Sequence, residues 1–455
     1  MKKKIVLVLC GCLLAGSLAG CGGSTESAGN GDSEIKSADE QELGDYEMQE
    51  LEDTEFTFYQ FSVENHDNYQ KLIDSYNQIH PNVKINLESV GGGSDWRASL
   101  KAKIAGGEEP TIILMEGPAD FEDFSDYLTD LSDQPWVEHL YESVVPDVTV
   151  DGKIVAAPSS IVNYGLVYNK KIFEAAGIDA STLTTYEAID AAFADLEKQI
   201  ENGELSDEFP MLEAVCELPA KEAWVLGNHA SNIALGQEFS SGIEAYEAPE
   251  IAFEYADAFK DYIDLQVKYS KYADDPSALN AVDYATALGG GFAIERVAVI
   301  QMGQWVVPEI QEIAPELLEN IGILPMPLKG VVEDTTCYGT ASYLTVNKHS
   351  DEAQQAAAKD FLNYMIMSEA GKDVEINVMN GNMPFDNYGD YPVQNPISAA
   401  GNEYAEEGKT TPLVFGGYPS GWSDALGADI QSYLAGSMTW DQVIDNAKAN
   451  WQEMR

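Results

Sequence analysis

The chain has 455 residues, which is more than one ordinary domain needs and suits two or three. Its 45% hydrophobic and 10% aromatic content is enough to form hydrophobic cores. The 77 Asp and Glu residues outnumber the 25 Lys and Arg residues and give a formal net charge of −52. Because such an excess repels phosphate backbones and anionic headgroups, we expect neither nucleic-acid binding nor membrane docking through charge. The acidity is typical of a protein that must stay soluble, and a cationic ligand is the alternative explanation.

The N-terminal residues have the composition of a bacterial secretory signal. Lys2, Lys3 and Lys4 precede an apolar stretch over 5–14, which is too short to span a bilayer as a helix. The run LAGC at 18–21 resembles the lipobox, where the peptidase cuts before the cysteine and its thiol carries diacylglycerol. We therefore expect a signal peptide over 1–20 and a lipid-anchored Cys21 on the extracytoplasmic face of the cell membrane. The alternative is an ordinary signal peptide with a chance cysteine.

Residues 21–54 are expected to form an acidic, disordered tether. Positions 22–54 hold eleven acidic residues and one Lys, with few large apolar side chains, so the segment cannot bury enough surface to fold. Beyond the signal and the anchor only Cys216 and Cys337 remain. We expect two buried free thiols, and one disulfide is the alternative in an extracytoplasmic protein.

The first globular stretch alternates between strand and helix patterns. We expect strands at 56–61, 83–87 and 111–115 and helices at 69–79 and 96–106. Asp67 or Asn68 is the expected N-cap of the first helix. This order predicts a parallel sheet covered by helices, in an α/β fold. Ligands bind beyond the carboxyl ends of such strands, which here are residues 62–66 and 116–120.

The later chain is predicted to be mixed. Helical patterns cover 184–202, 251–272 and 351–368. The C-terminal helix is expected to begin after Thr439, which forms a capping-box pattern with Gln442.

The sequence holds no convincing catalytic motif. The run GKT at 408–410 resembles the end of a phosphate-binding loop, but Gly401 precedes Gly408 by seven residues where five are required. The five histidines are scattered without metal-ligand spacing. We therefore expect no enzyme, no cofactor and no metal. A secreted glycoside-processing enzyme is the alternative, and it would need two carboxylates facing each other in one cleft.

An ordered set of short motifs resembles the family 1 extracellular solute-binding proteins, which include maltose-binding protein. The motifs are 104–110 (IAGGEEP), 151–158 (DGKIVAAP), 163–173 (NYGLVYNKKIF), 184–187 (TTYE), 303–305 (GQW) and 321–327 (IGILPMP). Thr111 stands where the family usually has Asp, and Gln304 where it often has Pro. The resemblance implies a two-lobed periplasmic-binding-protein-like (type II) fold with a hinged cleft. It also implies a monomeric receptor that delivers a carbohydrate to ABC transporter permease subunits.

The resemblance also suggests where the chain divides and what binds the ligand. Lobe one is expected over 55–158 and 328–380 and lobe two over 159–327 and 381–455, with crossings at 163–173 and 322–327. Trp305 and Trp422 are expected to stack on a sugar, because a pyranose has an apolar face and a belt of hydroxyls. The other candidates are Glu64, Asn65, Glu116, Asp120 and Asn163 for the hydroxyls and Tyr164 and Trp224 for further stacking. The alternatives are solvated acids for the carboxylates, core packing for the rings, and a polyamine-like cation as the ligand.

Overall fold

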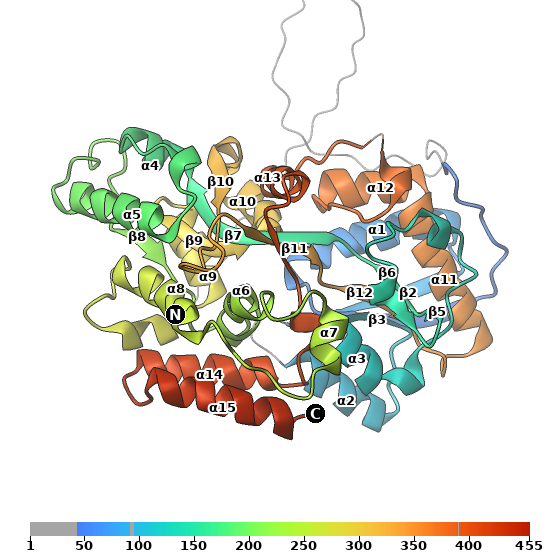
Figure 1. Ribbon diagram of the computed structural model, residues 1–455. Coiled ribbons are helices and arrows are strands. Elements are labelled where there is room, and N and C mark those ends of the chain that lie inside the picture. The colour runs from blue at the N-terminus through green and yellow to red at the C-terminus, as the bar shows by residue number, and fades with distance from the viewer. Residues whose placement is uncertain (1–42, 92–94, 390) are drawn as a thin grey trace, which may run out of the picture. The chain divides into compact units, whose positions relative to one another are not determined.

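The computed structural model describes residues 43–91, 95–389 and 391–455 (Figure 1). These belong to a compact unit that spans 36–455. The predicted signal peptide, Cys21 and most of the predicted tether therefore lie outside the described residues. Within the described part of the chain, no helix is long and apolar enough to cross a membrane.

The first sheet has the strand order β2-β1-β3-β12-β6. Its strands are β1 (Thr54–Gln60), β2 (Val83–Ser89), β3 (Ile112–Met115), β6 (Ala156–Pro158) and β12 (Tyr343–Val346). β1 lies parallel to both β2 and β3, which confirms the predicted strand–helix alternation, and β12 is antiparallel to β3 and β6. Helices α1 (His66–Ile79), α2 (Trp96–Gly106) and α11 (Glu352–Met367) bury apolar side chains in the same core.

Helix α1 begins earlier than its periodicity predicts. A single 3-10 turn, Val63–Asn65, leads directly into the helix and makes Asn65 its N-cap. The predicted caps, Asp67 and Asn68, are therefore wrong: both lie inside the first turn. This turn directs the residues after β1 toward the carboxyl edge of the sheet.

The second sheet has the order β13-β11-β7-β9-β8, and β10 also pairs with β7. Its strands are β7 (Ile161–Asn169), β8 (Ala214–Glu217), β9 (Val297–Gly303), β10 (Ile321–Leu324), β11 (Thr336–Thr340) and β13 (Thr410–Pro412). β7 is buried along almost its whole length because it has neighbours on both edges. A second hydrophobic core surrounds this sheet.

Four helices of the later chain match the sequence patterns. They are α5 (Tyr186–Glu201), α8 (Ala256–Lys268), α11 and α15 (Trp440–Glu453), and Thr439 and Gln442 form the predicted capping box. α15 packs along α14 (Trp422–Leu434). The remaining elements are α3 (Pro118–Asp123), β4 (Thr149–Val150), β5 (Lys153–Ile154), α4 (Lys170–Ala175), α6 (Ser231–Leu235), α7 (Gly242–Glu247), α9 (Tyr284–Ala287), α10 (Val307–Ile313), α12 (Glu369–Asp373) and α13 (Pro396–Glu406).

The chain passes between the two sheets at Ser159–Ser160 and at Ala341–Ser342, and between the two cores after Tyr388. The Ser159 amide donates to the Ser342 carbonyl at 3.0 Å, and the two serine hydroxyls share a further hydrogen bond. The segments expected to cross, 163–173 and 322–327, instead begin with β7 and β10, which pair antiparallel in the second sheet. The sequence-based lobe boundaries remain a prediction, while the sheets themselves change over at 159–160 and 341–342.

Candidate functional site

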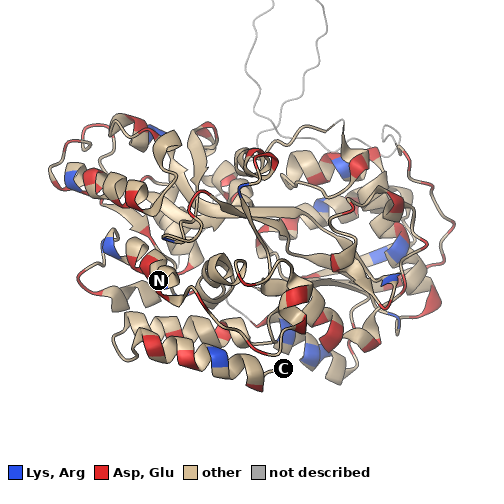
Figure 2. Cartoon of the chain, in the orientation of Figure 1, with Lys and Arg blue, Asp and Glu red and all other residues tan. Residues whose placement is uncertain are grey.

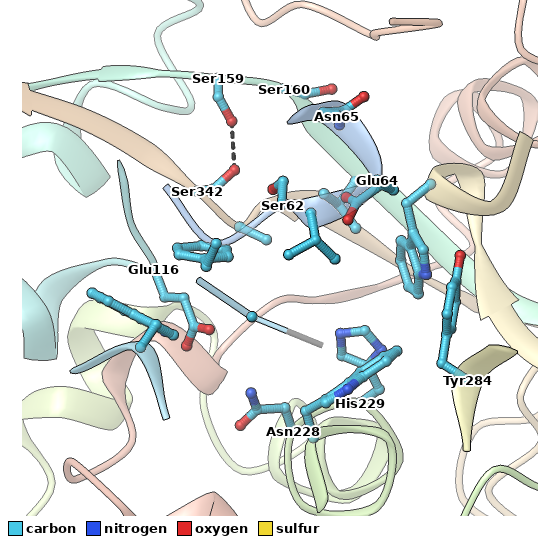
Figure 3. A pocket seen from close by; sticks show the side chains of 18 of the residues that line it. Ser62, Glu64, Asn65, Glu116, Ser159, Ser160, Asn228, His229, Tyr284 and Ser342 are labelled. Atoms are coloured by element: carbon cyan, nitrogen blue, oxygen red, sulfur yellow. Dashed lines mark hydrogen bonds between the residues drawn. The ribbon is translucent and has the colours of Figure 1, made fainter. Parts of the chain in front are cut away.

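A cavity of about 480 Å³ lies beside these crossings and is lined from both hydrophobic cores. The turn after β1 and the end of β3 contribute Ser62–Asn65 and Glu116, at the strand ends that the sequence predicts for a ligand site. Figure 3 shows Glu64 and Asn65 entering the view from one side and Asn228 and His229 from the opposite side. The crossings supply the hydroxyls of Ser159, Ser160 and Ser342.

Aromatic rings form one wall of the cavity. Trp224 and Trp305 have ring centroids 6.2 Å apart at an interplanar angle of 70°, and His229 lies 5.0 Å from each. Tyr284 extends this group, 6.3 Å from Trp224. Behind them Tyr164 stacks on His229 at 4.4 Å. Burial lowers the pKa of His229 to about 3, so the imidazole is neutral near pH 7 and behaves as one more flat ring.

A second aromatic pair lines the cavity from the first core. Phe61, directly after β1, stacks on Trp96 with centroids 5.1 Å apart and planes 28° apart. The guanidinium of Arg97 lies 4.5 Å from the centre of the Trp96 ring. The cavity therefore offers flat apolar surface from both cores.

The Arg97 guanidinium also organises the acidic residues at the end of β3. Its Nη2 donates to Glu116 Oε2 at 2.7 Å, and its Nε donates to Asp120 Oδ1 at 2.5 Å. Asp120 Oδ2 in turn accepts from the Glu116 amide at 2.8 Å. Glu116 faces the cavity as a neutralised carboxylate, while Asp120, 1% exposed, supports the arginine from behind.

Two other carboxylates line the cavity in a different state. Burial raises the pKa of Glu64 to about 7, with a smaller contribution from the charge of Glu309. Burial alone raises the pKa of Glu375 to about 8. Neither residue forms an ion pair within the described residues. The pKa of each rises because the charged carboxylate loses the solvent around it.

The structure brings five of the nine predicted ligand residues to the cavity wall. They are Glu64, Asn65, Glu116, Trp224 and Trp305. Asp120 lies behind Glu116, and Asn163 and Tyr164 are buried in β7. The Asn163 side chain donates to the Ile397 carbonyl at 3.1 Å, and Tyr164 backs His229.

Trp422 was expected to stack on the ligand, and it does not line the cavity in this structure. It is the first residue of α14 rather than part of a loop, and it is 0% exposed. Its indole nitrogen donates to the Ala447 carbonyl at 2.7 Å, and its ring packs edge-on against Tyr418 and Trp451. This location favours the alternative of core packing.

Several wall residues went unpredicted. Phe61 and Trp96 were assigned only to a strand and a helix, although both stand beside the strand ends where a ligand was expected. His229 and Glu375 carry no local signal, because an isolated histidine and one acid among 77 resemble many others in the chain. The described residues hold no group of three or more His, Cys, Asp or Glu side chains that suits a metal ion. Cys216 and Cys337 are buried free thiols.

Residues 71–374 match a family model described as bacterial extracellular solute-binding protein. Among curated proteins, an uncharacterised ABC transporter extracellular-binding protein of Pyrococcus horikoshii is 28% identical over 144 residues, or 30% of this chain and 32% of that protein. The xylose/arabinose-binding protein XacG of Haloferax volcanii is 27% identical over 184 residues, or 38% of this chain and 37% of that protein. The matches thus span about a third of the length of these relatives.

Solved structures resemble the chain over much more of its length. A sugar transporter from Bacillus licheniformis in complex with stachyose superposes with a TM-score of 0.68 at 20% identity, covering 88% of this chain and 100% of that one. The binding protein RafE in complex with raffinose gives a TM-score of 0.69 at 15% identity, covering 88% of this chain and 99% of that one. At these identities the likeness shows a shared two-lobed binding-protein fold.

Proposed function

Because the chain belongs to the bacterial extracellular solute-binding proteins, we propose that it captures a sugar or oligosaccharide and delivers it to the permease of an ABC importer. The main support for this function is the cavity wall, where Trp224 and Trp305 lie beside hydroxyl, amide and carboxylate groups. A pyranose matches such a wall, because its apolar face covers a ring while its hydroxyls take hydrogen bonds at the rim.

The size of the cavity and the ligands of similar proteins support a saccharide. A volume of about 480 Å³ falls within the usual range of about 300–1,000 Å³ for small-molecule sites. Stachyose and raffinose occupy the two similar structures, and XacG is named for binding xylose and arabinose. The loops around the cavity set the length and linkage of the sugar that each such protein binds.

A screen of mono- and oligosaccharides tests the proposal. The full chain, purified in a detergent without a sugar headgroup, is examined by thermal shift, and each hit is measured by calorimetry. We expect at least one saccharide to raise the melting temperature and to bind with one-to-one stoichiometry. If no saccharide binds while an unrelated solute does, the proposed substrate class is wrong.

We further propose that the protein is held on the outer face of the cell membrane by lipid on Cys21. Two or three acyl chains anchor a protein far more firmly than one, because each buried methylene contributes about 0.8 kcal/mol. The LAGC run at 18–21 supports this. Cys21→Ala should move the protein to the medium or leave it unprocessed, whereas unchanged fractionation with membranes would exclude the anchor.

A glycoside-processing enzyme is the rival from another class. It would need a pair of cavity carboxylates that turn over a bound saccharide. The family and the similar structures are binding proteins, which favours capture over turnover. Incubating each saccharide hit with the protein and looking for cleaved products separates the two functions.

A further inference from the structure

Glu64 and Glu375 face the cavity from separate elements of the first core. Glu64 lies in the turn between β1 and α1, and Glu375 in the π-helical turn Val374–Val378 (η12) that continues α12. Glu375 is only 4% exposed. Within the described residues its carboxylate accepts no hydrogen bond and meets no cation, so a buried polar group that lines the cavity is left without a partner. An arrangement of this kind is costly unless a ligand completes it.

Among the described residues, no cation of the cavity wall is free to neutralise these two carboxylates. Arg97 is committed to Glu116 and Asp120. Lys221 Nζ lies 3.0 Å from Asp283 Oδ2. His229 is neutral near pH 7, because burial lowers its pKa. The end of the cavity that holds Glu64 and Glu375 therefore has no cation among the described wall residues to stabilise the ionised carboxylates, so both carboxyl groups stay largely protonated up to about neutral pH.

The two carboxylates act on the same neighbourhood. The hydroxyl of Tyr69, which also lines the cavity, has its pKa raised by burial and further by the charges of Glu375 and Glu64. The pKa of Tyr284 is raised by burial and further by the charges of Glu309 and Glu64. Figure 3 shows Glu64 on the Tyr284 side of the cavity and away from Glu116. Glu64 thus shares one neighbouring side chain, Tyr69, with Glu375, and another, Tyr284, with the aromatic wall.

Aromatic faces border this acidic end. Tyr284 lies 6.3 Å from Trp224, and Trp224 lies 6.2 Å from Trp305, measured between ring centroids. A cation beside such rings gains from their electron-rich faces. A desolvated ammonium group requires carboxylates and aromatic rings around it. A ligand that carries only hydroxyl groups does not require this environment.

We propose that the Glu64–Glu375 end of the cavity binds a protonated primary amine carried by the saccharide ligand. The ligand class is therefore an amino sugar or an oligosaccharide that contains one with its amine free. This inference rests on the proposed saccharide function and specifies its substrate. An N-acetylated sugar places an uncharged amide where the two carboxylates need a cation, so it should be the poorer ligand.

Calorimetry with matched saccharides tests the proposal on the full chain. The probes are glucose with glucosamine, galactose with galactosamine, and the β-1,4-linked glucosamine trimer with its N-acetylated counterpart. Measurements at about pH 7 keep the amine largely protonated, since comparable amino groups titrate near 7.7–8.0. We expect the best free-amine probe to bind at least about tenfold more tightly than its neutral counterpart, which corresponds to 1.4 kcal/mol.

Amide variants locate the amine. Glu64→Gln and Glu375→Gln keep the shape of each side chain and remove its charge, so each should abolish most of the preference for the free-amine probe over its neutral counterpart, measured as the ratio of the two affinities. Asp147→Asn is the matched control, because burial also raises the pKa of Asp147, to about 6, but it lies outside this cavity. The control should keep the full preference, and the melting temperature of every variant checks that it is folded.

The outcomes separate the two proposals. A neutral saccharide that binds as tightly as its free-amine counterpart overturns the amine site and leaves the saccharide receptor standing. An amine preference that survives both glutamine variants overturns the assigned location. If no saccharide binds, or if spermidine binds more tightly than every saccharide, the receptor proposal fails together with the inference.

Discussion

Trp305 and Trp422 show how burial separates two tryptophans with the same predicted role. Trp305 lines the cavity and contacts His229 and Trp224, so part of its ring is open to a ligand. Trp422 is enclosed by Tyr418 and Trp451 and has its indole nitrogen satisfied by the chain itself. One ring is therefore placed to bind and the other to stabilise.

Alanine variants at Trp305 and Trp422 should lose different properties: the first should lose affinity and the second stability. Trp305→Ala should weaken saccharide binding about thirtyfold, because a central aromatic anchor is often worth 2 kcal/mol or more. Trp422→Ala should cost about 3–5 kcal/mol of unfolding free energy and leave the affinity of the folded fraction nearly unchanged. Calorimetry and thermal melting of both variants measure the contrast. Equal loss of affinity in both would show that Trp422 also reaches the ligand.

Glu375 should make the stability of the ligand-free protein depend on pH. Its pKa is about 8 in the folded state against 4.5 for a glutamate in the unfolded chain, so between these values the folded state binds more protons than the unfolded state. Stability from this group is complete below about pH 4.5 and is lost as the pH rises toward 8. Glu375→Gln should therefore be more stable than the wild type at pH 8, by a few kcal/mol, and similar to it at pH 5.

Melting curves of the wild type and Glu375→Gln across this pH range test the sign. Asp147→Asn controls for the loss of a partly buried acid elsewhere, because the pKa of Asp147 is raised less, to about 6. A wild type that is more stable than Glu375→Gln at pH 8 would mean that a cation within the protein already compensates the carboxylate.

At the scale of elements, close backbone packing positions the aromatic wall. The π-helical turn Val225–Ala230 (η7) carries Asn228 and His229 and packs against α14. A Cβ on Gly427 would come within 2.6 Å of the Ala223 carbonyl oxygen, and a Cβ on Gly227 would meet the backbone of Ser423. Helix α14, which holds Trp422 in the core, thus fixes the turn that presents the cavity residues.

Gly427→Ala should disturb this contact and the cavity together. Forcing the two backbones apart should cost about 1–3 kcal/mol of stability and should weaken binding by displacing Trp224, which follows Ala223. Gly106→Ala is the control, because no heavy atom lies within 4 Å of its Cβ position. Thermal melting and calorimetry of the two variants give the comparison. If Gly427→Ala is destabilised but binds with wild-type affinity, the contact with α14 does not position the cavity residues.

The parts of the fold that depend on local pattern could be predicted. The first three strands and the two helices between them follow from apolar periodicity, as does the capping box at Thr439. Trp422 was expected in a loop because of Pro419 and Gly421, but it begins α14, and the partners that bury its ring come from distant elements that no local pattern reveals. The positions where the chain changes sheets, 159–160 and 341–342, could not be read from the sequence either, because strand pairing decides them and a motif shows no pairing.

The site residues that lie at the ends of strands could be predicted from the sequence. Glu64, Asn65 and Glu116 were proposed because ligands bind beyond the carboxyl ends of parallel strands, and all three line the cavity. Glu375 comes from the helical region after β12, more than 300 residues from Glu64, and nothing near it in the sequence distinguishes it from a solvated acid. Only the packing of the first core turns this carboxylate toward the cavity.

Over the whole molecule, acidic residues are spread over the helices around both sheets, as Figure 2 shows, rather than gathered on one element. This distribution agrees with a role of the net charge in solubility. Glu64 and Glu375 do not contribute to solubility in this way, because both line the cavity. A ligand rather than water is therefore expected to interact with them.

The segments that join the two cores should act as a hinge. Only a few segments join them, and two of these, 159–160 and 341–342, lie side by side and are held to each other by hydrogen bonds. Such an arrangement permits bending about the crossings while each sheet stays rigid, and a ligand held between the two cores should favour the closed form. Small-angle scattering should therefore show a smaller radius of gyration at saturating saccharide. Trp305→Ala at the same saccharide concentration should show little compaction, and a wild-type radius that does not change at saturation would contradict a hinge.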